Sequence, residues 1–277
     1  MKKYAIILLL ALSTTFALAQ KKEKIKGSKT VTTEQKEVGK FNSIEVDDNL
    51  EVYLEKGEKP EIKIEADDNL HGIITIQLRD NTLRLYTSKE AIKYKKLIVK
   101  VTYTNDMTLV TSKHEATINA IQEIQLDDIT IKSLDNSKLF LNVNSKSFLL
   151  QADDKSKIEL NLKSEKAKVE LSKNANLKSL ISASDLTCDL YQKSEANIEG
   201  DATNAVIRLD NNSSFIGNKL TIKNIDLTAE SYSSSRINAE TSIIIDAGDK
   251  SEIQLYGTPK IEVRKFADEA KLFKKIK

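Results

Sequence analysis

Carboxylates are the most abundant side chains in this sequence that can do chemistry. Eight of them form four adjacent pairs, namely Asp47-Asp48, Asp67-Asp68, Asp127-Asp128 and Asp153-Asp154. Acids from neighbouring segments can converge into a calcium site or into a site that cleaves polysaccharides. Each pair, however, lies near the end of a predicted strand, where aspartate caps a turn by bonding to its own backbone. We therefore expect turn chemistry from these pairs, with calcium binding and polysaccharide cleavage as the alternatives.

Histidine and serine patterns typical of enzymes are absent from the sequence. His71 and His114 are the only histidines, and neither has a metal-binding spacing such as His-Glu-x-x-His. No Gly-x-Ser-x-Gly segment, which presents the nucleophile of many hydrolases, occurs. We expect both histidines to be solvated or bonded locally. The sequence thus predicts no catalytic, cofactor-binding or metal-binding residue and no enzymatic activity.

Aromatic side chains, which often support carbohydrate recognition, are sparse. There is no tryptophan, and the tyrosines downstream of Ala19 are scattered: Tyr53, Tyr86, Tyr94, Tyr103, Tyr191, Tyr232 and Tyr256. Tyr191 and Tyr232 follow predicted strands, so we expect them at outward corners. Surface packing is the favoured interpretation for them, and contact with a ligand is the alternative.

The elements that position these residues repeat at a nearly constant interval. A first series of triplets consists of Ile131-Lys132-Ser133, Leu150-Gln151-Ala152, Val169-Glu170-Leu171, Cys188-Asp189-Leu190, Ile207-Arg208-Leu209, Leu227-Thr228-Ala229, Ile245-Asp246-Ala247 and Arg264-Lys265-Phe266. The intervals between their third residues are 19, 19, 19, 19, 20, 18 and 19. A polar residue between apolar or small ones, in all triplets but the last, indicates a strand with one buried face. Cys188 shares its position with Leu150, Val169 and Ile207, so we predict a buried, unreactive thiol.

A second series of triplets, each with a small, a polar and an apolar residue, follows the first after about four residues. It consists of Ala116-Thr117-Ile118, Ser137-Lys138-Leu139, Ser156-Lys157-Ile158, Ala175-Asn176-Leu177, Ala196-Asn197-Ile198, Ser213-Ser214-Phe215, Ser235-Arg236-Ile237, Ser251-Glu252-Ile253 and Ala270-Lys271-Leu272. The gap is too short for a helix and long enough for a corner. Because a 19-residue unit cannot enclose a core alone, the coils must stack on one another.

Residues before the repeat alternate between short apolar strands and turn-forming segments. Ile74–Leu78 and Leu83–Tyr86 flank Arg79-Asp80-Asn81-Thr82, which predicts a hairpin. Five segments carry a resemblance to a known family. They are Phe41-x-x-Ile44-x-Val46, Val52-x-Leu54-x-x-Gly57, Ile62-x-Ile64-Glu65-Ala66-Asp67-Asp68-Asn69-Leu70, Leu78-x-Asp80-x-x-Leu83-x-Leu85 and the late turn Tyr256-Gly257-Thr258-Pro259-Lys260. With these segments the sequence resembles the head-GIN domain family of auto-transporter adhesins. The resemblance covers nearly all of the chain after Phe41. It implies a β-solenoid from an exported protein of the Bacteroidetes type, although Asp135-Asn136-Ser137 and similar segments replace the family's usual Gly-Ser-Gly punctuation.

Residues 1–19 have the layout of a secretory signal peptide: Lys2 and Lys3, an apolar run from Ala5 to Leu12, and Ala17-Leu18-Ala19 as a cleavage site. Removing them takes two lysines and no acid, so the 43 Lys and Arg of the whole chain fall to 41, equal to the 41 Asp and Glu. This balance gives no indication of a nucleic-acid partner. The apolar run is too short to cross a bilayer, and no later stretch is long enough, so we expect no membrane span.

Together these patterns predict an all-β protein built as a right-handed parallel β-helix, or β-solenoid, with some antiparallel strands in its N-terminal part. We expect a signal peptide over 1–19, a flexible leader over 20–37, an N-terminal β part over 38–110 and the solenoid over 111–277. The predicted function is an adhesin-like binding role without catalysis or cofactors, in the periplasm, at the cell surface or outside the cell. The expected partners are envelope polysaccharide or another surface protein. The alternatives are a polysaccharide-processing β-helix enzyme and a purely structural envelope component.

Overall fold

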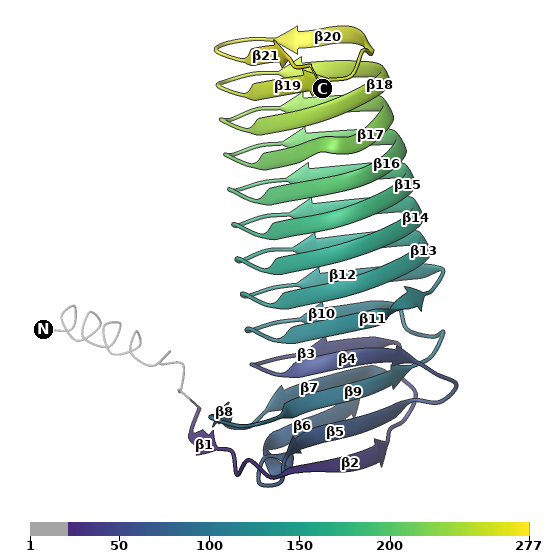
Figure 1. Cartoon of the computed structure of the whole chain (residues 1–277), viewed down its shortest axis with the longest axis vertical. Helices are drawn as coiled ribbons and strands as arrows, with labels where there is room; N and C mark the ends of the chain where they lie inside the picture. The colour runs from purple at the N-terminus through teal and green to yellow at the C-terminus, as the bar shows by residue number, and fades with distance from the viewer. Residues whose placement is uncertain (1–21, 277) are drawn as a thin grey trace, which may run out of the picture.

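The computed structural model describes residues 22–276, and the predicted signal peptide lies outside this range. Nearly all regular structure in it is β-strand, and the strands of successive coils stack into a long solenoid (Figure 1). The N-terminal part contains β1 (Lys24–Lys26), β2 (Val31–Glu37), β3 (Ser43–Val46), β4 (Glu51–Lys56), β5 (Glu61–Asp67), the 3₁₀ turn η1 (His71–Ile73), β6 (Ile74–Arg79), β7 (Thr82–Thr87), β8 (Glu90–Ile92) and β9 (Leu97–Tyr103).

The solenoid continues through twelve more strands within the described residues. They are β10 (Leu109–Ser112), β11 (Thr117–Gln125), β12 (Asp128–Ser133), β13 (Lys138–Ala152), β14 (Lys157–Leu171), β15 (Asn176–Leu190), β16 (Glu195–Leu209), β17 (Ser214–Ala229), β18 (Ser234–Ala247), β19 (Glu252–Tyr256), β20 (Lys260–Phe266) and β21 (Lys271–Lys274). Of these, β13 to β18 are the longest, with 14 to 16 residues each. From β10 onward every pairing is parallel, and the register of β13 on β14 and of β14 on β15 is offset by 19 residues. The predicted solenoid is confirmed, with coils of the predicted length.

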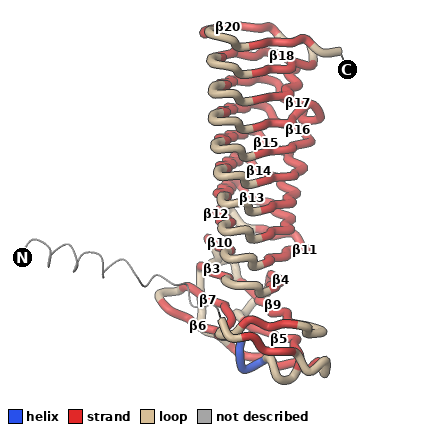
Figure 2. The backbone as a smooth tube through the Cα atoms, turned by 90° about the vertical axis from the view of Figure 1, so that its left-hand side faces the viewer, coloured by secondary structure: helices blue, strands red, loops and turns tan. Residues whose placement is uncertain are grey.

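Each central coil is one continuous strand that bends once. In β13 the alternation of buried and exposed residues is interrupted by two exposed neighbours, Lys146 and Ser147, which mark a round corner. We call residues 138–144 of β13, before this corner, the leading face, and residues 147–152, which begin with the corner residue Ser147, the trailing face. Consecutive coils are joined by a tight turn, such as residues 153–156, and these turns are stacked along one edge (Figure 2).

The tight turns explain how the chain reverses in so few residues. Asp135 and Asn136 have φ angles of 53° and 62°, and Asp154 and Lys155 have 48° and 65°. Two consecutive left-handed residues turn the chain sharply, and Asp and Asn tolerate this conformation better than most residues. The backbone N–H of Asn136 also donates to the carbonyl of Asp154 at 2.9 Å, so neighbouring turns are bonded to each other.

The core register agrees with the first series of triplets. Six side chains predicted to face inward are buried, with exposures of 0 or 1%: Val169, Leu171, Cys188, Leu190, Ile207 and Leu209. The three polar residues between them were predicted to face solvent; Arg208 is exposed and Glu170 is half-buried. Asp189 is only 8% exposed because the outward-facing Arg208 covers it, with Nη1 to Oδ1 at 2.9 Å.

Two triplets of the second series require correction. Ala196 pairs with Leu177, and Ser235 pairs with Phe215, so both occupy the apolar position of their coils. The small residues equivalent to Ala175 are therefore Ser194 and Ser233, two positions earlier. A shift of two residues preserves which side chains face inward, so the core is unaffected.

The last triplet of the first series also departs from the pattern. Lys265 pairs with Asp246 and Phe266 with Ala247 after a register irregularity, and Phe266 is 47% exposed. Within the described residues no later strand covers β20 on the trailing side.

Residues 24–37 do not form the flexible leader that their composition suggested. β1 pairs with β8, and β2 pairs antiparallel with β5 over seven residue pairs, from Val31 with Asp67 to Glu37 with Glu61. β2 has no buried residue, so its place is held by backbone hydrogen bonds.

The N-terminal part continues the solenoid stack. β3 and β4 pair in parallel with β10 and β11, so the sheet is not interrupted near residue 110. The predicted hairpin is present as β6 and β7, with Asp80 and Asn81 both at positive φ in a two-residue loop. One apolar core runs from Phe41 to Leu255.

Candidate binding groove

The paired aspartates lie at turns, and their polar partners come from the protein itself. Asp47 accepts a hydrogen bond from the backbone N–H of Asp48 at 2.7 Å, and Asp48 accepts one from the N–H of Thr87 at 2.9 Å. Lys173 lies 3.4 Å from Asp153 and 3.3 Å from Asp154. Burial and the neighbouring Asp154 raise the pKa of Asp153. These contacts indicate that the acids stabilise the turns and the tight-turn edge of the solenoid.

Asp127-Asp128 and Asp67-Asp68 differ strongly in exposure. Asp127 is exposed and lies 3.1 Å from Lys146, whereas Asp67 is fully buried. Burial would raise the pKa of Asp67, but backbone N–H donors of Lys29, Lys96 and Lys95 lower it below its usual value. Asp67 therefore ties the segment before β2 to the segment before β9. Over residues 22–276, no three His, Cys, Asp or Glu side chains gather as a metal site would require.

The histidines and the cysteine lie far from one another. His71 is 7% exposed and bonds through Nε2 to the Thr32 hydroxyl at 2.9 Å, and the exposed His114 bonds through Nδ1 to Asp47 at 2.7 Å. Both are thus bonded within the protein, to partners that are distant in the sequence and not local as expected. Cys188 is buried between coils, and this burial raises the pKa of its thiol. Within residues 22–276 the hydroxyl that hydrogen-bonds to an imidazole is that of Thr32, on His71, whereas His114 bonds to a carboxylate.

Tyr191 and Tyr232 lie on the tight-turn edge, where they were predicted. They are 39% and 60% exposed, and Lys250 Nζ lies 5.6 Å from the centre of the Tyr232 ring. They belong to different coils two repeats apart, so they do not form a joint platform.

The trailing face carries a stripe of charges that satisfy one another. Glu170 accepts from Gln151 of the previous coil at 2.7 Å and lies 2.5 Å from Lys168, while Arg208 lies 2.9 Å from Asp189. Hydrogen bonds from Gln151 and Lys168 lower the pKa of Glu170. Since these groups already have partners, this stripe is poorly suited to bind a ligand.

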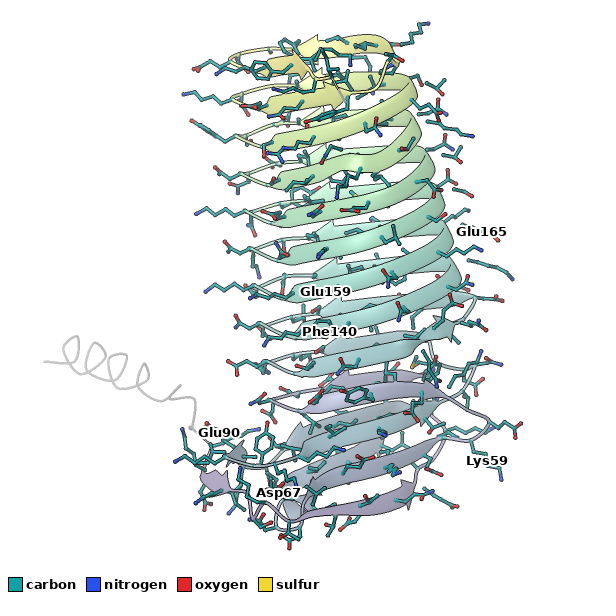
Figure 3. The ribbon with its side chains drawn as sticks, viewed as in Figure 1. Lys59, Asp67, Glu90, Phe140, Glu159 and Glu165 are labelled. Carbon is teal, nitrogen blue, oxygen red and sulfur yellow. The ribbon has the colours of Figure 1, made fainter. Side chains whose placement is uncertain are left out.

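The leading face, in contrast, is hollowed across the coils β13 to β16. A hollow of about 480 Å³ lies between two outward rows of side chains, and we call it the face groove. Parallel register places Phe140, Glu159, Lys178 and Asn197 in one row and Asn142, Asn161, Leu180 and Glu199 in the next. Figure 3 shows Phe140 and Glu159 on successive coils of this face.

The groove combines exposed apolar surface with polar side chains. Phe140 is 40% exposed and Leu180 is 55% exposed, whereas most large apolar residues of the solenoid are buried. The Asn161 amide donates to the side-chain oxygen of Asn142 at 2.6 Å. Glu159 and Lys178 have no ion-pair partner within 4.0 Å among residues 22–276.

The face groove continues toward the round corner. A second hollow of about 450 Å³ shares Asn161 and Leu180 with it, and shares Lys163 and Asp201 with a third of about 990 Å³ at the corner itself. The corner hollow is mainly polar, and Lys56 on its wall is engaged, since it donates to the Gln125 carbonyl at 2.8 Å.

The groove residues were not recognised in the sequence, although a signal was present. Outward residues 140, 159, 178 and 197 recur with the period of the core positions, as do 142, 161, 180 and 199. Applying the 19-residue interval to the outward positions, as well as to the inward ones, aligns these groove residues.

Comparison with known proteins identifies the family. The family model "Putative auto-transporter adhesin, head GIN domain" matches residues 40–172 and 159–259. This chain belongs to that family. No curated protein matches the chain.

Solved structures with the same fold include three from Parabacteroides species. A putative adhesin from Parabacteroides merdae ATCC 43184 has a TM-score of 0.67 and 18% identity, covering 91% of this chain and 99% of that one. A putative adhesin from Parabacteroides distasonis ATCC 8503 has a TM-score of 0.69 and 17% identity, with coverage of 90% and 99%. A putative lipid binding protein from the same organism has a TM-score of 0.67 and 13% identity, with coverage of 91% and 100%. At these identities the likeness concerns the fold alone.

The family description is adhesin-like, in agreement with the resemblance stated from the sequence. No helix within residues 22–276 has the length and apolar character to cross a membrane.

Proposed function

We propose that this head-GIN protein is exported to the bacterial cell envelope or surface and acts there as a non-catalytic, adhesin-like binding protein. The face groove is its binding site. Membership of the adhesin family supports the role, and the layout of residues 1–19 supports the export.

The observation that carries this proposal is the exposed apolar surface of the groove. Leu180 is 55% exposed on a stacked sheet, between Asn161 and Glu199 of its row. A rigid sheet that leaves large apolar side chains uncovered beside polar side chains offers a preformed surface, so binding requires little ordering of the protein. The stacked coils place outward side chains at strand spacing along both rows of the groove, which favours binding to a repetitive partner.

Binding of the labelled chain 20–277 to envelope fractions tests the proposal. We expect Leu180→Ser to reduce binding about tenfold, because it removes apolar contact at the centre of the groove. Leu78→Ser is the matched control, since Leu78 is 41% exposed on β6 and lies outside the groove. Equal binding by the Leu180→Ser variant and the unmodified chain would refute the assignment of the groove.

Absence of catalysis is tested on the same material. Neutral and acidic polysaccharides incubated with the chain should yield no new reducing ends or unsaturated products. Reproducible turnover that disappears on substitution of Glu159 would instead establish the polysaccharide-processing alternative.

A further inference from the structure

We infer that the ligand of the face groove is an uncharged polysaccharide chain that lies along the solenoid axis, with about one sugar per coil. This inference rests on the proposed function and specifies the chemical class of its partner.

The spacing between coils matches the length of a sugar unit. Neighbouring coils are joined by parallel strand pairing, so equivalent side chains on the leading face recur about every 4.8 Å. One pyranose ring of an extended 1,4-linked chain has nearly the same length. A polymer laid across the coils therefore meets an equivalent position at each sugar, which lets weak contacts act together.

The side chains of the groove can make the contacts that sugars require. Sugar rings have apolar C–H faces, which pack on aromatic and aliphatic side chains, and Phe140 and Leu180 are exposed in adjacent rows of the groove. Sugar hydroxyls both donate and accept hydrogen bonds. Side-chain amides do the same, and the groove contains Asn142, Asn161 and Asn197.

The charged side chains of the groove are nearly balanced. The groove is lined by two acids and one base, Glu159, Glu199 and Lys178. Glu199 is paired with Lys219 at 3.0 Å, which leaves one acid and one base of opposite sign. A site that binds a polyanion has clustered Lys or Arg side chains, and a site that binds a polycation has clustered acidic side chains. The groove has neither, so its charge balance favours an uncharged polymer.

Affinity electrophoresis and calorimetry with soluble glucomannan and a soluble 1,4-linked glucan test the inference, with polygalacturonate as the acidic comparison. The chain 20–277 should bind at least one neutral polymer and should bind polygalacturonate at least about tenfold more weakly. Phe140→Ser should weaken neutral-polymer binding about tenfold, and Asn161→Ala should weaken it by about threefold or more.

Two matched controls separate the groove from general surface effects. Phe273 occupies the same register row as Phe140 in the last coil and is 41% exposed, so Phe273→Ser should change affinity less than about twofold. Asn204 lies on the trailing face, and Asn204→Ala should behave likewise. All four substitutions are at outward positions, and unchanged melting temperatures will show that folding is preserved.

Failure of every neutral polymer to bind, preferential binding of polygalacturonate, or binding that Phe140→Ser and Asn161→Ala leave unchanged would each overturn the inference. If Leu180→Ser still reduces binding to envelope fractions about tenfold in that case, the proposed function stands and the partner belongs to another chemical class. If it does not, both proposals fail.

Discussion

Truncating one buried leucine tests whether the coils are stacked in the described register. Leu190 is 0% exposed and pairs in register with Leu171 and Leu209, each 1% exposed, so three leucines stack through the core. Leu190→Ala removes three side-chain carbons and leaves a cavity. The cavity cannot collapse, because backbone hydrogen bonds to the coils on both sides hold the strand in place. We expect a loss of about 2–5 kcal/mol in the free energy of unfolding.

Leu180 provides a control on the same strand. It faces outward and is 55% exposed, so Leu180→Ala should cost less than about 1 kcal/mol. Urea titration of both variants and the parent chain measures the difference, provided that the m-values agree. Equal losses, or a larger loss for Leu180→Ala, would mean that inward and outward positions are exchanged and would refute the register.

Three further predictions concern the turns, the ion pairs and metals. Lys155→Gly should stabilise the protein by about 0.5–1 kcal/mol in thermal or urea unfolding, because Lys155 has a φ of 65° that glycine adopts without strain; destabilisation would contradict the turn geometry. Hydrogen bonds from Lys96 and Lys100 lower the pKa of Glu65, so its stabilising contribution is present above the unfolded value of 4.5 and is lost as pH falls through the folded pKa. Glu65→Gln should therefore cost up to about 1 kcal/mol at pH 7 and little at pH 2, and a pH-independent cost would contradict this. A chelator should leave the melting temperature unchanged, whereas a fall of several degrees restored by calcium would reveal a metal site.

Periodicity made the solenoid predictable from sequence. Inward positions such as Val169, Cys188 and Ile207 must match in size and polarity from coil to coil, so their regular spacing is preserved in the sequence. The β6–β7 hairpin was predictable for a local reason, since Asp80 and Asn81 tolerate the left-handed backbone of its loop.

Other features depend on contacts that leave little pattern in the sequence. β2 is held by backbone hydrogen bonds to β5, and its side chains are free to be charged. Ser194 and Ala196 are both small and both inward, so only pairing with the neighbouring coil decides which one follows the tight turn. The groove arises where outward residues of four coils align, and outward positions carry no requirement to be apolar.

The most direct test of the central claim is a titration of ¹⁵N-labelled protein with a neutral 1,4-linked oligosaccharide, followed through asparagine side-chain amide resonances. The groove amides of Asn142, Asn161 and Asn197 should shift with a common Kd, while those of Asn204 and Asn224 on the trailing face should not move. Shifts confined to Asn204 and Asn224, or no shift at any of these amides on titration to saturating oligosaccharide, would contradict a binding groove for neutral polysaccharide on the leading face.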